Sequence, residues 1–241
     1  MASATGIPEV HPATIASEES APLLGRPGDV IQKQDESIAR NLISGTASVA
    51  QAGVWILAAL VWSNILTQPV SLFTAHPLLA TSGLLLQIQA AFILQPTTTP
   101  QQKLLGTRIH YSIQIVSIVC FLGAFTVIEV NKGDHAHFVS PHGILGLLTV
   151  VFIVLQALIG VIQFFLPVTA LGSLDAGKRV YKYHRWTGYV LLLLESATIL
   201  AAMQTGYNLE VLGIPTWAVL VAIVLTLSGV GARIKKHKLG L

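Results

Sequence analysis

Charged residues are scarce in this chain. Lys, Arg, Asp and Glu make up 10% of the 241 residues, whereas an average soluble domain has about 25%. There is one cysteine, which excludes a disulfide framework. The net charge of +3 is not accompanied by a pattern of basic and aromatic residues, which argues against nucleic-acid binding. With 53% hydrophobic residues, the composition instead indicates a protein whose solvent is largely a lipid bilayer.

Residues 1–40 lack any long apolar run. They hold six acidic residues, three basic residues and four prolines, so we expect a disordered cytosolic tail and no cleavable signal peptide. Within the tail, Glu19, Leu23 and Leu24 form an acidic dileucine pattern, which is typical of sorting to vacuolar, lysosomal or endosomal membranes. Residues 41–235 are predicted to be the transmembrane domain, and residues 236–241 a basic cytosolic tail.

Six apolar segments follow the tail, each long enough to cross about 30 Å of hydrocarbon as a helix. Backbone groups cannot stay unpaired in lipid, so helices are the expected spanning elements. Buried helices of a soluble bundle are the alternative, and they would need a polar face that these segments lack. The predicted helices cover residues 46–66, 73–95, 107–130, 141–166, 183–204 and 216–234.

The distribution of Lys and Arg predicts the orientation in the membrane. If the N-terminal tail is cytosolic, 13 of the 14 Lys and Arg residues lie in cytosolic segments, as the positive-inside rule requires. The exception is Lys132, between the third and fourth predicted helices. Both termini are therefore predicted to be cytosolic.

Four of the eight histidines share one placement. His76, His110, His142 and His184 each lie near the start of one of the four central predicted helices. Because consecutive helices run antiparallel, His76 and His142 would share the outer level of the bundle, and His110 and His184 the inner level. Two imidazoles that face each other across a bundle core are what bis-histidine haem ligation requires.

A zinc site is the competing interpretation of these histidines. A zinc site needs three or four ligands at one point, whereas here the histidines come in twos and carboxylates are nearly absent from the helices. Gly83, Gly146 and Gly188 lie on the histidine-bearing faces, where they would admit a flat macrocycle or simply allow close helix contact.

The stretches FTAHP, HAHFVSPHGILGLL and YKYHRWTGYVL resemble the cytochrome b561 family of transmembrane electron-transfer proteins, in particular its single-domain members without a DOMON domain. The resemblance covers about residues 46–235. It implies an all-α membrane protein with six transmembrane helices, whose central four-helix bundle holds two b haems. On matching positions, it implies His76 and His142 as ligands of the outer haem iron, and His110 and His184 as ligands of the inner one. Members that use ascorbate carry a basic stretch near the end of the second helix, where this chain reads AAFILQPTTTP.

Basic residues near the two histidine levels are candidates for contacts with substrates. Arg108, Lys182 and Arg185 could attract an anionic cytosolic reductant such as ascorbate, pair with haem propionates, or only mark the topology. Lys132 and His137 could hold an outer acceptor, either monodehydroascorbate or chelated ferric iron, or belong to a solvated loop. Glu195, an acid deep in a helix, suggests a hydrogen-bonded neutral group or a link to proton movement.

The predicted function is therefore that of a transmembrane oxidoreductase with two b haems, a small-molecule donor and a small-molecule acceptor. No catalytic acid or base is expected, and a homodimer is possible. Two alternatives are a haem-free ion transporter lined by histidines and a membrane-anchor subunit of a larger redox complex.

Overall fold

The computed structural model describes Leu24 and residues 27–240. Over this part of the chain every regular element is helical, and there is no β-strand. The elements, in chain order, are η1 (Ile38–Leu42), α2 (Ala47–Leu66), α3 (Leu72–Leu94), α4 (Pro100–Lys132), α5 (Pro141–Phe165), α6 (Pro167–Leu171), α7 (Leu174–Ala202), η2 (Asn208–Leu212), α8 (Thr216–Gly231) and η3 (Lys236–Lys238).

Hydroxyl side chains begin four of the long helices. Ser71 and Thr99 form capping boxes at the starts of α3 and α4. Ser140 and Ser173 accept hydrogen bonds from backbone N–H groups in the first turns of α5 and α7. These caps satisfy backbone donors that have no partner within the helix. The chain therefore enters each of the four helices at a fixed residue, and this fixes the level of the histidine that follows.

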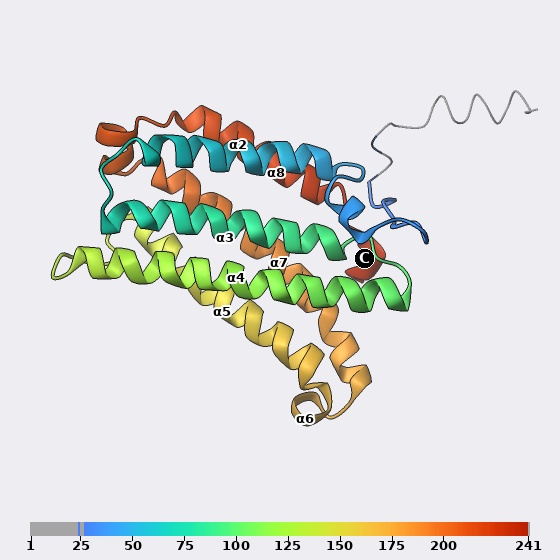
Figure 1. Cartoon of the computed structure of the whole chain (residues 1–241). Helices are drawn as coiled ribbons and strands as arrows, with labels where there is room; N and C mark the ends of the chain where they lie inside the picture. Colours follow the sequence, from blue (N-terminus) through green and yellow to red (C-terminus); the bar gives the residue numbers. More distant parts are fainter. Residues whose placement is uncertain (1–23, 25–26, 241) are drawn as a thin grey trace, which may run out of the picture.

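The six long helices form three contacting pairs: α3 with α4, α5 with α7, and α2 with α8. They run roughly side by side along the molecule, and the short helix α6 connects α5 to α7 at one end (Figure 1). Residues 27–46 and the C-terminal residues lie at that same end, which we call the terminal end. The loops 67–71, 133–140 and 203–215 lie at the opposite end, which we call the far end.

All six predicted helices are present, and α3, α4, α5 and α7 are the four central ones. Two of them begin earlier than predicted, α4 at Pro100 and α7 at Leu174, because their first turns are polar and escape a hydropathy pattern. By length and composition, α2, α3, α4 and α5 are able to cross a membrane. Helix α8 is apolar but has 16 residues, about 24 Å.

Large apolar side chains cover the outer surface of the central helices. Ile115 and Val119 on α4 are 59% and 64% exposed, and Leu155 and Leu158 on α5 are 49% and 52% exposed. Such a continuous apolar surface is unfavourable in water and favourable against lipid tails. The protein is therefore an integral membrane protein.

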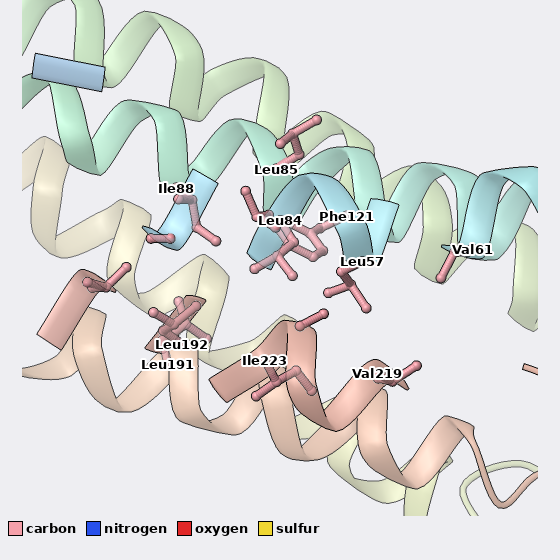
Figure 2. Close-up of a cluster of buried hydrophobic side chains, with 14 of the residues drawn as sticks. Leu57, Val61, Leu84, Leu85, Ile88, Phe121, Leu191, Leu192, Val219 and Ile223 are labelled. Atoms are coloured by element: carbon pink, nitrogen blue, oxygen red, sulfur yellow. The ribbon is translucent and has the colours of Figure 1, made fainter. Parts of the chain in front are cut away.

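The buried core lies between α2, α3, α7 and α8 and includes Phe121 of α4 (Figure 2). Close packing of α2 on α8 depends on two glycines. A Cβ on Gly53 would lie 2.5 Å from the carbonyl oxygen of Ala222, and one on Gly229 would lie 2.5 Å from the backbone nitrogen of Ala50. Small residues of this kind allow helix backbones to approach closely in membranes.

Residues 27–40, which were predicted to be part of a disordered tail, make specific contacts with the terminal end. The backbone N–H of Gly28 donates to the carbonyl oxygen of Ala232, and that of Gln32 to the carbonyl oxygen of Pro96. The rest of that tail, with Glu19 and Leu23 of the dileucine pattern, lies outside the described residues. The predicted domain boundaries at residues 40 and 235 stay predictions.

Candidate functional site

The four central histidines lie at two levels of the bundle. His76 in α3 and His142 in α5 are near the far end, while His110 in α4 and His184 in α7 are near the terminal end. Each pair joins one helix of the α3–α4 pair to one helix of the α5–α7 pair. The histidines thus lie across the boundary between two separately packed helix pairs.

At the far end, His76 and His142 face each other. Their ring centroids are 6.0 Å apart, and the ring planes are inclined by 80°. Metals bond imidazole nitrogen at about 2 Å, so two rings on opposite sides of one metal have centroids about 6 Å apart. The observed separation fits a pair of axial ligands.

Backbone carbonyls orient three of the four rings. The Nδ1 atom of His76 lies 2.9 Å from the carbonyl oxygen of Ala124, and that of His110 lies 2.9 Å from the carbonyl oxygen of Ala90. The Nδ1 atom of His142 lies 3.0 Å from the carbonyl oxygen of Thr198. A carbonyl accepts a hydrogen bond, so each Nδ1 carries the proton and each Nε2 keeps its lone pair for a metal.

His184 is held differently from the other three. Its Nδ1 is buried without a hydrogen-bond partner among the described residues. Its backbone carbonyl accepts a 2.6 Å hydrogen bond from Nε2 of Gln156. A Cβ on Gly160 would lie 3.4 Å from the His184 ring, so α5 passes close to this imidazole.

The donor set fits haem. The described residues contain no group of three or more His, Cys, Asp or Glu side chains able to hold a bare metal ion. They do contain the facing pair of His76 and His142, whose rings are both oriented by backbone carbonyls. A tetrapyrrole supplies four equatorial nitrogens and needs only two more ligands, and this is what such a pair offers.

The three glycines expected beside the ligands have different surroundings. A Cβ on Gly83 would lie 2.9 Å from the Phe121 ring, so this glycine serves the packing of α3 on α4. A Cβ on Gly188 would lie 3.0 Å from Nε2 of Gln156, while one on Gly146 would meet nothing nearer than 4.0 Å. Of the three, only Gly146 would accept a Cβ at an ordinary van der Waals distance, 4.0 Å from the Thr198 side chain.

Glu195 in α7 is 3% exposed, and it lies between the two histidine levels along the helix. The Nε2 atom of Gln87 in α3 donates to both carboxyl oxygens, at 2.9 and 2.8 Å. The carboxyl group is thus a hydrogen-bonded link between the α3–α4 and α5–α7 pairs.

The two candidates for acceptor contacts lie together at the far end, Lys132 as the last residue of α4 and His137 in the loop 133–140. His137 forms an ion-pair contact with Glu129, and Nζ of Lys132 lies 3.8 Å from the same carboxylate. Lys132 also lies over the Phe138 ring, 5.4 Å from its centroid, and that ring stacks on Phe125. The hydrogen bond to the Gly133 carbonyl, followed by the contact with Glu129, raises the pKa of His137 above its ordinary value. These contacts therefore tie the loop 133–140 to the last turn of α4.

At the terminal end, two of the three candidates for donor contacts line a cavity. Lys182 and Arg185 lie on the first turns of α7 and contribute to a cavity of about 540 Å³. Arg108 lies on the exposed surface of α4, two residues before His110, and does not line this cavity. The remaining basic side chains of what we call the basic cavity are Lys178, Arg179, His237 and Lys238.

Several of these features were not apparent from the sequence. Backbone acceptors such as those of Ala90 and Ala124 have no side-chain signature, so no pattern could have identified them. His237 and Lys238 looked like solvated tail residues, because a local pattern does not show that a tail folds back. The sequence shows that Gln87 and Glu195 are polar residues within apolar helices. It does not show that the two side chains form hydrogen bonds with each other.

Comparisons with known proteins agree with this architecture. The family described as eukaryotic cytochrome b561 matches residues 75–208, a range that contains all four central histidines. The transmembrane reductase CYB561D2 of Homo sapiens is 29% identical over 192 residues, which cover 75% of this chain and 84% of the human protein. No solved structure matches the chain significantly.

Proposed function

Because the chain belongs to the eukaryotic cytochrome b561 family, whose members bind haem b, we propose that it carries electrons across a membrane through two b haems. As a membrane oxidoreductase of this family, it has six helices available for spanning. We propose that α2, α3, α4, α5, α7 and α8 all span. The electron donor is a cytosolic small molecule, and the acceptor lies on the opposite side.

The two histidine pairs at opposite ends of the bundle carry this proposal. His76 and His142 would hold one haem, and His110 and His184 the other. Haem held by these histidines would supply reversible one-electron storage. The chain itself orients three rings through carbonyl hydrogen bonds, which fixes the tautomer and strengthens the basicity of the ligand nitrogen.

The charges at the two ends support the assignment of donor and acceptor sides. We propose that Arg108, Lys182 and Arg185 attract an anionic reductant such as ascorbate to the terminal end, since basic residues concentrate anions by electrostatic steering. At the far end, we propose that Lys132 and His137 guide monodehydroascorbate or chelated ferric iron. Sorting to a vacuolar, lysosomal or endosomal membrane and a homodimeric state stay predictions.

Haem stoichiometry tests the proposal directly. The purified full chain is expected to contain two low-spin, bis-imidazole haems in a pyridine haemochrome assay. The double variant His76→Ala/His142→Ala is expected to retain one haem, because it removes both ligands of a single site. The double variant His76→Ala/His110→Ala is expected to lose both, because it leaves each iron with one protein ligand.

His135→Ala is the matched control, since it removes a histidine of the far-end loop that is not a proposed ligand. It is expected to keep two haems. A wild-type chain with no haem, or with one haem when fully loaded, would contradict the two-haem proposal. One intact haem in His76→Ala/His110→Ala would instead show that the pairing is wrong.

A further inference from the structure

The basic cavity is built from two segments that are far apart in the sequence. The Nη1 atom of Arg185 in α7 donates a 3.1 Å hydrogen bond to the carbonyl oxygen of Lys238 in η3. The Nζ atom of Lys238 lies 3.5 Å from the carbonyl oxygen of Thr97, in the connection between α3 and α4. These contacts hold the C-terminal segment against the first turns of α7, so the cavity is a defined part of the fold.

Positive charge in this cavity is largely uncompensated. Among its lining side chains, Lys178 alone pairs with an acid in the described residues, through a 2.9 Å contact with the exposed Asp175. Burial, followed by repulsion from Lys235, Arg185 and Lys103, lowers the pKa of Lys238 to about 8. A bound anion would relieve this repulsion, because it favours the charged form of every surrounding base.

We propose that the basic cavity binds a phosphate-bearing polyanion, namely the phosphorylated headgroup of an acidic membrane lipid. Five Lys and Arg side chains and His237 line an open cavity of about 540 Å³, a volume within the range of small-molecule sites. Clusters of four to eight Lys and Arg residues next to a transmembrane helix are suited to anionic lipid headgroups. Arg179 and Arg185 add planar donors that match phosphate oxygens.

An anionic reductant is the competing occupant, because Lys182 and Arg185 are also candidates for donor contacts. A singly charged reductant would leave most of the positive charge uncompensated, whereas a headgroup with two or more phosphates would balance it. A soluble compound with the same phosphates shares the chemistry. The assignment of this end to the cytosolic leaflet rests on the proposed orientation, while binding itself does not depend on electron transfer.

Binding is measured with the purified full chain, loaded with haem, in nanodiscs of neutral phosphatidylcholine. The probes are short-chain phosphatidylinositol bisphosphate, free inositol trisphosphate, inorganic phosphate and ascorbate, each followed by thermophoresis and at two salt concentrations. We expect the bisphosphate lipid to bind most tightly, and more weakly at higher salt. Preference for the free inositol phosphate would support the same phosphate chemistry with a soluble source.

Two variants connect this binding to the cavity. Arg179→Ala and Lys238→Ala are each expected to weaken lipid binding about fivefold, the effect of one cation near an anionic headgroup. Lys236→Ala is the matched control, since Lys236 is exposed in the same η3 segment and does not line the cavity. It is expected to change the affinity less than twofold. Arg179 is exposed, so its variant avoids the tail contact that Lys238→Ala removes.

Three results would overturn the proposal. The first is the absence of saturable binding of either phosphorylated probe. The second is ascorbate binding that the bisphosphate lipid does not displace, which would assign the cavity to the reductant. The third is equal weakening by Lys236→Ala and Arg179→Ala, which would show a diffuse surface charge. Because haem content is measured separately, a failure of the two-haem proposal is distinguishable from each of these.

Discussion

At the scale of single residues, the protonation of His137 is expected to stabilise the far-end loop. Its N–H groups can donate to the Gly133 carbonyl and the Glu129 carboxylate when the ring is charged. The folded loop therefore raises the pKa of His137. Stabilisation is complete below the unfolded value of about 6.5 and is lost as the pH rises through the folded value.

Hydrogen–deuterium exchange of residues 133–140 checks this prediction. After correction for intrinsic rates, exchange is expected to be slower at pH 6 than at pH 8 in the wild type. In Glu129→Gln the difference is expected to shrink, because the amide carries no charge to pair with the imidazolium. Equal protection at both pH values in the wild type would rule out a stabilising role for the charged ring.

For the central histidines, the sequence predicts which residues pair but not how their rings are oriented. The pairing of His76 with His142 was predictable, because antiparallel helices bring alternate helix starts to one level. The orientation of each ring was not, because it depends on carbonyls such as that of Ala124, which every residue possesses. Lys132 and His137 were predicted as acceptor contacts or as part of a solvated loop, and their shared contact with Glu129 was not foreseen.

At the scale of helices, the contact between α2 and α8 is expected to be intolerant of a single methyl group. A Cβ at Gly229 would lie 2.6 Å from the carbonyl oxygen of Thr46 and 2.5 Å from the backbone nitrogen of Ala50. Both neighbours are backbone atoms, so a helix has to move. Gly229→Ala is expected to destabilise the fold by about 1–3 kcal/mol, the usual cost of overpacking.

Thermal unfolding of the purified protein measures this effect as a lower Tm. Gly231→Ala, two residues further along, is the control. A Cβ there would meet nothing within 4 Å, and alanine favours a helix over glycine, so an equal or slightly higher Tm is expected. If both variants lowered Tm equally, close packing at Gly229 would not be the cause.

Hydropathy did not predict where α4 and α7 begin. The sequence predicted helices from residues 107 and 183, but α4 and α7 begin at Pro100 and Leu174. Their first turns contain Lys103 and Lys178, which belong outside the hydrocarbon. These turns are helical because Thr99 and Ser173 cap them, and a capping hydroxyl is a weaker sequence signal than an apolar run.

At the scale of the whole molecule, the charge asymmetry predicts which end faces the cytosol. Thirteen of the 14 Lys and Arg residues fall in segments assigned to one side, so tags at both termini are expected to be accessible from the cytosol. In intact organelles, protease should remove both tags without detergent. Protection of both tags would reverse the donor and acceptor sides, and protection of one would contradict an even number of spans.

Most of the architecture was predictable because a bilayer leaves few solutions: apolar segments of about 20 residues must become helices. The folding back of the C-terminal tail was not predictable. The tail itself is held by the hydrogen bond from Arg185 to the Lys238 carbonyl. Just before it, Arg233, 2% exposed, donates from Nη1 to the carbonyl oxygens of Asn41 and Ser44. Hydrogen bonds between residues almost 200 positions apart in the sequence have no local sequence signature.

The boundary between the α3–α4 and α5–α7 pairs has a consequence for biogenesis. Each proposed haem site takes one ligand from the first pair and one from the second. When only α3 and α4 have entered the membrane, each proposed haem site therefore has one of its two histidine ligands. Cofactor capture has to wait for α7, since His184 is the last of the four ligands to be synthesised. In cells starved of haem, the α3–α4 and α5–α7 pairs are accordingly expected to be less firmly held together. Such a chain is expected to be recognised by membrane quality control.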